Sequence, residues 1–369
     1  MKKRFPVYTL SACLVAVVWY FAPKKQQSPD ESTRKGIGQP PPGVMEIVDR
    51  GTEGPVSKPT QNQASQGDGG SATPTGSSFL NLHKVDALDY NGWLQQMSKE
   101  DDNGQAKVIA GMLSNDGGLV REGVEMDEGS PMLAYVGSTD PAFSAEEQLL
   151  HSKRFYANDP ENALAAFIYA TRLFEHGNKE GAFQVLQESK DRQVLDDYSL
   201  DRLQLMKEAY QAAGLTNLEA QLQSTLALGK PYLGNLLSFV GELDDVADTL
   251  PPQEAANLRN LTSSMGIRVS QSAATGTILD QLTGLAMEER SLEGLGDDDN
   301  SPFEGMTVEE AQTSIKDRRD RLKDTISKFS GMDALSILTQ DPVLMEGYFE
   351  AFRRNGELEA IHWLIGQFK

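Results

Sequence analysis

Residues Pro231–Leu250 have the sequence PYLGNLLSFVGELDDVADTL, in which apolar residues recur every three or four positions. Such spacing places the side chains in one stripe along a helix, so the stretch predicts an amphipathic α-helix. The dipeptide Pro251-Pro252 stops this helix, because proline cannot continue a helix from its interior. The predicted stripe consists of Tyr232, Leu236, Phe239, Val240, Leu243, Val246 and Leu250.

The same period continues after this stretch. A helix is predicted from Gln253 onward, through Ala255, Leu258 and Leu261. The tetrapeptide Thr307-Val308-Glu309-Glu310 matches a capping box and predicts the start of another helix. That helix turns inward Ala311, Ile315, Leu322, Ile326 and Phe329. Because the pattern is helical almost throughout from Ser144 to the C-terminus, we expect an all-α fold.

The opposite face of the helix after Thr307 carries a mixed-charge run, Lys316-Asp317-Arg318-Arg319-Asp320-Arg321. We interpret this run as a solvated helix face, with an acid-binding patch as the alternative.

Residues 79–143 are expected to form a small irregular segment. Val85–Met97 and Gln105–Leu113 predict short helices, and Asn115–Pro141, rich in Gly, Asp and Glu, predicts an irregular acidic loop. A second acidic loop is predicted at Gly294–Pro302. Its aspartates do not match an EF-hand, because Pro302 and Val308 occupy the positions that need Gly and Glu.

Three places have the pattern of a helix, a turn glycine and a second helix. The turn glycines are Gly177, Gly214 and Gly356, and each is followed within four to six residues by an alanine. Glycine ends a helix without a Cβ penalty, and a small residue lets the next helix pack closely against the first. The following alanines are Ala182, Ala220 and Ala360.

The junction Asn158-Asp159-Pro160-Glu161-Asn162-Ala163, with the helix pair after it, resembles tetratricopeptide-type repeats. The resemblance covers roughly residues 145–225 and extends to 345–369. It departs from the family at Ala166, where Trp is common, and at Glu219, where a small residue is expected. The step from Gly177 to Gly214 is about 37 residues, against a family period of about 34. The resemblance implies paired helices and a groove for proteins or peptides, and it brings no catalytic residues.

Composition excludes several classes of function. The chain has 369 residues with 34 Lys+Arg and 54 Asp+Glu, so its net charge is 34 − 54 = −20. This balance argues against a nucleic-acid binder, because phosphate contacts need clustered cations. A single cysteine excludes an intrachain disulfide and any CxxC pair.

Motifs that carry chemistry are absent from the sequence. The four histidines, His83, His151, His176 and His362, are scattered, and no HExxH, Gly-x-Ser-x-Gly or nucleotide-binding glycine pattern occurs. We therefore predict no catalytic residue, no metal and no cofactor. An envelope enzyme with an unrecognised site stays as the alternative.

The N-terminus carries an uncharged apolar run, Phe5–Pro23, between Met1-Lys2-Lys3-Arg4 and Lys24-Lys25. As a helix its 19 or so residues measure roughly 28 Å, which just spans a bilayer core. An uncleaved signal-anchor is the favoured interpretation. A lipoprotein modified at Cys13, within Leu10-Ser11-Ala12-Cys13, and a cleaved signal peptide are the alternatives.

The sequence thus divides into five parts. Residues 1–23 form the signal-anchor and 24–78 a disordered linker rich in Pro, Gly, Ser and Gln. Residues 79–143 form the small irregular segment, 144–296 a helical-repeat-like domain and 297–369 a C-terminal helical segment.

This layout predicts a membrane-tethered helical scaffold that mediates protein–protein interaction at the cell envelope. Its body is expected outside the cytoplasm, in the periplasm if the host is Gram-negative. An oligomerising structural component or a lipoprotein is a further alternative. The candidates for a partner-binding surface lie on the first helix of the repeat-like region, with a place in the core as the favoured alternative: Phe167, Tyr169, Arg172 and Phe174.

The predicted orientation can be tested with a reporter enzyme that is active only in the cytoplasm, fused to the C-terminus. We expect no reporter activity in intact cells, because a signal-anchor behind a short cationic N-terminal tail exports the part of the chain on its C-terminal side. Reporter activity equal to that of a cytoplasmic control would contradict the prediction.

Overall fold

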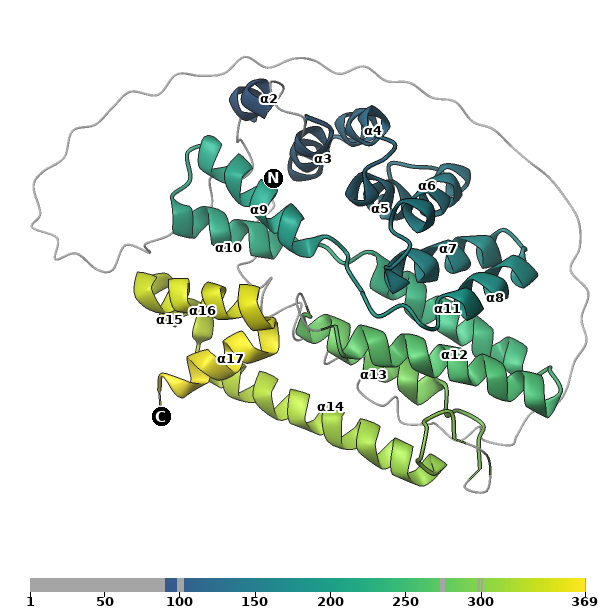
Figure 1. The fold of residues 1–369 in the computed structure, drawn as a ribbon. Helices are drawn as coiled ribbons and strands as arrows, with labels where there is room; N and C mark the ends of the chain where they lie inside the picture. The colour runs from purple at the N-terminus through teal and green to yellow at the C-terminus, as the bar shows by residue number, and fades with distance from the viewer. Residues whose placement is uncertain (1–89, 98–102, 273–275, 297–298, 300, 369) are drawn as a thin grey trace, which may run out of the picture. The chain divides into compact units, whose positions relative to one another are not determined.

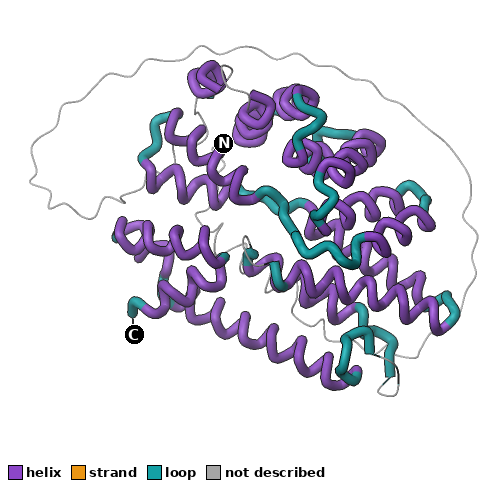
Figure 2. Tube along the Cα trace, viewed as in Figure 1, coloured by secondary structure: helices purple, strands orange, loops and turns teal. Residues whose placement is uncertain are grey.

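The computed structural model describes residues 90–97, 103–272, 276–296, 299 and 301–368. These residues form α-helices joined by short loops, with no strand among them, so the predicted all-α class is confirmed for the described part (Figures 1 and 2). The predicted signal-anchor, linker and Cys13 lie outside the described residues. None of the described helices is long and apolar enough to cross a membrane.

The helices are α2 (Asn91–Met97), α3 (Asn103–Ser114), α4 (Gly117–Met126), α5 (Pro131–Thr139), α6 (Ala145–Asn158), α7 (Ala163–Glu175), α8 (Lys179–Glu188), α9 (Ser199–Ala212), α10 (Asn217–Ala227), α11 (Tyr232–Ala247), α12 (Pro252–Ser270), α13 (Ile278–Arg290), α14 (Val308–Gly331), α15 (Ala334–Gln340), α16 (Pro342–Asn355) and α17 (Glu357–Gly366).

Neighbouring helices pack as pairs: α3 with α4, α5 with α6, α7 with α8, α9 with α10, α12 with α13 and α16 with α17. This arrangement is compatible with a helical-repeat array. The three predicted glycine turns are confirmed, because Gly177, Gly214 and Gly356 have φ of 79°, 98° and 84°. These angles lie in the left-handed region that favours glycine.

The small residue after each glycine turn lies in a helix–helix contact. Ala182, Ala220 and Ala360 are each 0% exposed. A larger side chain at any of these positions would push its helix away from the core, so the alanines explain why the second helix of each pair lies so close.

The predicted apolar stripes are also confirmed. In α11 the stripe residues from Tyr232 to Leu243 are buried, and Val246 and Leu250 pack against them. Helix α11 ends before Pro251, and α12 begins at Pro252. The capping box at Thr307 is present, since its hydroxyl accepts the Glu310 N–H and its own N–H is bound by the Glu310 carboxylate.

The prediction of an irregular loop over Asn115–Pro141 is wrong, because this stretch contains α4 and α5. Asp116 caps α4 and Ser130 caps α5, each with its side-chain oxygen. Glycines in this stretch are contact points between helices. A Cβ on Gly123 would lie 2.5 Å from the Gly104 carbonyl oxygen, so α3 and α4 approach closely only because both positions lack a side chain.

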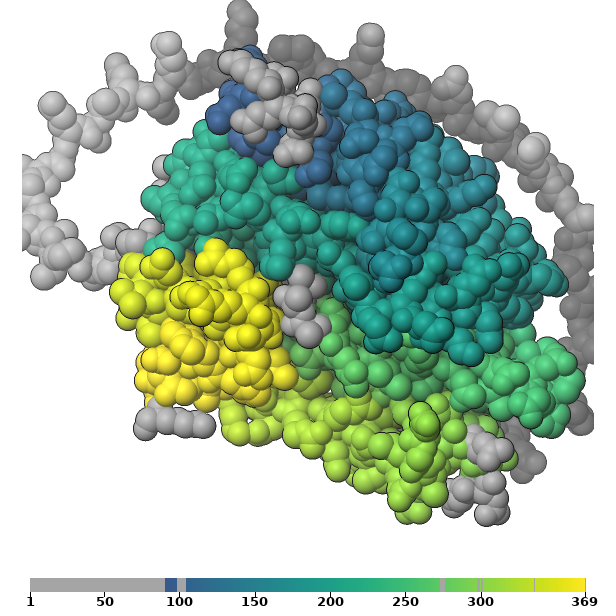
Figure 3. All heavy atoms as spheres, in the orientation of Figure 1, coloured from purple at the N-terminus to yellow at the C-terminus, as the bar shows by residue number. Residues whose placement is uncertain are grey.

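Two larger apolar cores and a smaller one hold the helices together. The first core is formed mainly by α4–α8, α11 and α12, and the second by α13–α17 with Leu222 of α10. The smaller core joins α2 and α3 to α9. Helix α10 contacts α16, and Figure 3 shows the C-terminal residues, in yellow, packed against teal residues of this region.

The contact between α12 and α13 depends on Gly284. A Cβ at this position would lie 2.3 Å from the Ser270 backbone nitrogen, whereas a Cβ on Gly234 of α11 has no neighbour within 4 Å. We expect Gly284→Ala to lower the free energy of unfolding by about 1–3 kcal/mol through overpacking. The matched Gly234→Ala should raise it by about 0.5–1 kcal/mol, because alanine favours the helix.

Urea unfolding followed by circular dichroism measures both variants. Equal effects of the two substitutions would show that the close helix contact at Gly284 is not maintained in solution.

Candidate functional site

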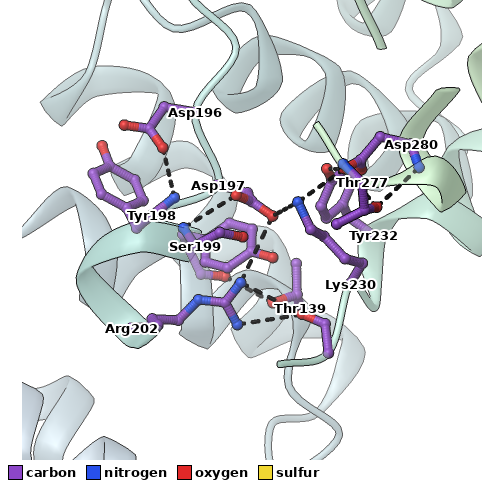
Figure 4. Close-up of polar contacts among 12 residues, drawn as sticks. Thr139, Asp196, Asp197, Tyr198, Ser199, Arg202, Lys230, Tyr232, Thr277 and Asp280 are labelled. Atoms are coloured by element: carbon purple, nitrogen blue, oxygen red, sulfur yellow. Dashed lines mark hydrogen bonds and ion pairs between the residues drawn. The ribbon is translucent and has the colours of Figure 1, made fainter. Parts of the chain in front are cut away.

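Four charged side chains meet inside the protein, and we call them the buried charge cluster: Asp197, Arg202, Lys230 and Asp280 (Figure 4). Their side chains are between 1% and 4% exposed. The Lys230 Nζ lies 2.9 Å from the Asp197 Oδ2 and 3.0 Å from the Asp280 Oδ2. The Arg202 Nη2 lies 3.7 Å from the Asp197 Oδ2. Two cations therefore balance two carboxylates.

The loop that carries Asp197 is held in place by Asn162, which is fully buried. The Asn162 side chain accepts the Asp196 N–H at 3.1 Å and donates to the Asp196 carbonyl oxygen at 2.7 Å. The Ala163 N–H binds the Val194 carbonyl oxygen at 2.8 Å. The junction that resembles tetratricopeptide repeats therefore fixes the loop before α9.

Asp280 reaches the cluster from the first turn of α13. Its Oδ2 accepts the N–H and hydroxyl of Thr277 in a capping box, and its Oδ1 accepts the Tyr232 hydroxyl at 3.0 Å. Glu357, at the start of α17, accepts the Ile278 N–H at 2.8 Å. The first turns of α11, α13 and α17 are thus tied to one another.

Burial shapes the acid–base properties of this region. Burial alone raises the pKa of Asp197, but the Lys230 ammonium and the Arg202 guanidinium outweigh it and hold the pKa below the ordinary value of 3.8. Burial raises the pKa of Glu357, and the Asp280 carboxylate raises it further, against the opposing effects of the Ile278 N–H and Lys230. Burial and Asp280 also raise the pKa of Tyr232 well above 10.0.

The buried charge cluster has a structural role, because its ion pairs join the starts of α9, α11 and α13. Its side chains are almost completely shielded from solvent, so no substrate reaches them, and the four charges compensate one another. A catalytic group has to lie within hydrogen-bond reach of its substrate. The lowered pKa of Asp197 therefore reflects its ion pairs inside the fold, and the raised pKa values of Glu357 and Tyr232 reflect burial.

An accessible groove lies between α13, α14 and α17, with a cavity volume of about 610 Å³. We call it the α14 groove, and this volume lies in the range of ordinary ligand pockets. Four apolar residues line it, of which Leu285 and Leu322 are buried and Leu358 and Ile365 half-buried. The polar lining consists of Ser270, Gln281, Arg318, Arg321, Asp324, Thr325, Lys328 and His362.

Cations outnumber carboxylates at the rim of the α14 groove. Arg318 pairs with the buried Glu288, and Lys328 pairs with Asp324. Arg321 is exposed and has no hydrogen bond or ion pair with any described residue. In a chain of net charge −20, a groove with an unpaired arginine and an apolar floor is suited to an anionic, partly apolar ligand.

Part of this site is visible in the sequence. The mixed-charge run Lys316–Arg321 contributes Arg318 and Arg321 to the α14 groove, whereas Lys316 is exposed outside it. Acid binding is the alternative interpretation of that run. The leucines that α13 and α17 contribute to the groove cannot be recognised in the sequence, because their spacing is that of ordinary core residues.

The four predicted partner-binding residues lie on α7 and not at the α14 groove. Phe167, Arg172 and Phe174 are 1%, 8% and 7% exposed, and Tyr169 is half-buried with its ring centroid 5.4 Å from that of Tyr156. Arg172 donates to the Ser138 carbonyl oxygen at 3.0 Å and pairs with Glu175 at 2.8 Å. Their partner-binding role stays a prediction.

Among the described residues, no group of three or more His, Cys, Asp or Glu side chains is arranged to hold a metal ion. Comparisons with protein-family models, with characterised proteins and with solved structures find no match to this chain. The fold defines the chain as a helical protein of packed helix pairs. The α14 groove is the site from which we infer its function.

Lys230 separates two buried carboxylates, so its removal tests the buried charge cluster. We expect Lys230→Met to lower the free energy of unfolding by about 3–5 kcal/mol, because Asp197 and Asp280 are left buried without their shared partner. Lys153→Met, at an exposed lysine with no ion pair among the described residues, should change it by less than about 0.5 kcal/mol. Thermal unfolding of both variants measures these changes. If Lys230→Met changed the free energy of unfolding as little as Lys153→Met does, the buried charge cluster would not stabilise the fold.

Glu357 makes stability depend on pH in a defined direction. Its pKa is raised in the folded state, so folding favours the protonated acid, and this contribution is lost as pH rises from below 4.5 through the folded-state pKa. Glu357→Gln keeps an oxygen for the Ile278 N–H and cannot ionise. We expect the free energy of unfolding of this variant, relative to that of the wild type, to be greater at pH 7 than at pH 4. Urea unfolding of both proteins at the two pH values measures this difference, and an equal difference at both would contradict the prediction.

Proposed function

We propose that this chain is a membrane-tethered helical scaffold that binds a protein partner at the cell envelope through the α14 groove. The observation that carries the proposal is the combination of Leu285, Leu322, Leu358 and Ile365 along the groove with the unpaired Arg321 at its rim. Apolar surface supplies affinity, and charges at the rim supply orientation and selectivity.

Two further features support a binding role. Paired helices form a closely packed framework, because Ala182, Ala220 and Ala360 let each second helix approach the core without a gap. The predicted anchor and linker, residues 1–78, would keep the body near the membrane and raise its effective concentration for membrane-bound partners.

The proposal can be tested by photo-cross-linking in the cells that make the protein. A photoreactive amino acid is placed at the exposed His362, at the rim of the α14 groove, in the full-length chain. We expect a covalent adduct with one protein. A second substitution, Arg321→Glu, should reduce its yield at least about tenfold by reversing the rim charge.

Lys316→Glu is the matched control for this experiment, because it makes the same charge change on α14 outside the groove. It should leave the yield within about twofold of the parent. Absence of an adduct at His362, or equal losses with both substitutions, would refute binding at the α14 groove. An adduct between two copies of this chain would favour the oligomerising component instead.

A further inference from the structure

We propose that the segment of the partner that occupies the α14 groove is an acidic amphipathic helix of about three turns. The inference rests on the proposed function and names the chemistry of the partner. Four features of the α14 groove support this partner: the length of the groove, its apolar floor, its charge and the helices that border it.

The length follows from α14. Its groove-lining residues Arg318, Arg321, Leu322, Asp324, Thr325 and Lys328 are separated by steps of one to three along the helix. The ten steps from Arg318 to Lys328 correspond to about 15 Å of helix. A ligand helix of about ten residues, or three turns, matches this length.

The floor requires an apolar stripe on the ligand. Leu285 of α13 and Leu322 of α14 are buried at its base, and Leu358 and Ile365 of α17 border it while half-buried. An amphipathic helix presents apolar side chains every three or four residues, which is the pattern that a groove between helices accommodates. The described residues contain no strand that could instead pair with an extended peptide.

The rim requires carboxylates on the ligand. Arg321 has no partner among the described residues, and Arg318 and Lys328 lie three and seven residues away on the same helix. A ligand helix whose glutamates are three and seven residues apart, spanning ten steps in all, can place one carboxylate near each of these side chains, and Arg321 is the one without a carboxylate partner of its own. Because arginine binds carboxylates with two parallel hydrogen bonds, Arg321 is the strongest of the three candidate anchors.

The net charge of the chain strengthens this selectivity. With a net charge of −20, the chain as a whole repels an acidic segment, so the approach of such a segment depends on local cations such as Arg321. A basic helix would be repelled by the cations of the groove and attracted to acidic surface elsewhere. Its binding would therefore not depend on Arg321.

The test uses two synthetic peptides of about 14 residues in which leucines recur every three or four positions, flanked by glutamates in one and by lysines in the other. Binding to the full-length chain in detergent micelles is measured by fluorescence anisotropy. We expect the glutamate peptide to bind at least about tenfold tighter than the lysine peptide. Arg321→Glu should remove that preference, and Lys316→Glu should change the affinity by less than about twofold.

The outcomes separate this inference from the proposed function. If the photo-cross-link at His362 forms but the glutamate peptide does not bind, the partner binds the groove by other chemistry and the inference is overturned while the function stands. Equal binding of both peptides also overturns it. The same result follows if dodecyl phosphate, an anionic amphiphile, binds tighter than the glutamate peptide with the same dependence on Arg321, because the groove would then be a lipid site.

Discussion

The structure depends on one buried ammonium group, that of Lys230, held between the carboxylates of Asp197 and Asp280. These residues come from the starts of α11, α9 and α13, which are distant in sequence. Charges are costly to bury unless they are paired, so the three helix starts can converge only in the arrangement that satisfies all three groups. The cluster thereby specifies the relative positions of helices whose apolar faces alone would tolerate other arrangements.

The α14 groove is built on this cluster. Helix α13 is anchored at its first turn by Asp280, and Glu357 at the start of α17 binds the Ile278 N–H of α13. The same two helices supply Leu285 and Leu358 to the groove, where α14 completes it. The polar interactions at the helix starts and the apolar residues farther along the same helices therefore both contribute to the packing around the α14 groove.

Close helix packing is achieved throughout by small residues. Glycines at 104, 123, 266 and 284 lie where two backbones approach each other, and the alanines after the glycine turns lie in full contact. Such packing brings the helix backbones close together in the described part of the chain, where a larger side chain would collide with the neighbouring helix.

Sequence patterns alone predict the all-α class, the end of α11, the start of α12, the capping box of α14 and the three glycine turns. All of these follow from interactions within a few residues, namely helix periodicity, capping and the backbone freedom of glycine. Three features become visible in the folded chain alone: Gly123 lies at the contact of α4 with α3, Asn162 holds the loop before α9, and α13, α14 and α17 converge on one groove. These features depend on residues far apart in the chain, whose contacts no local pattern records.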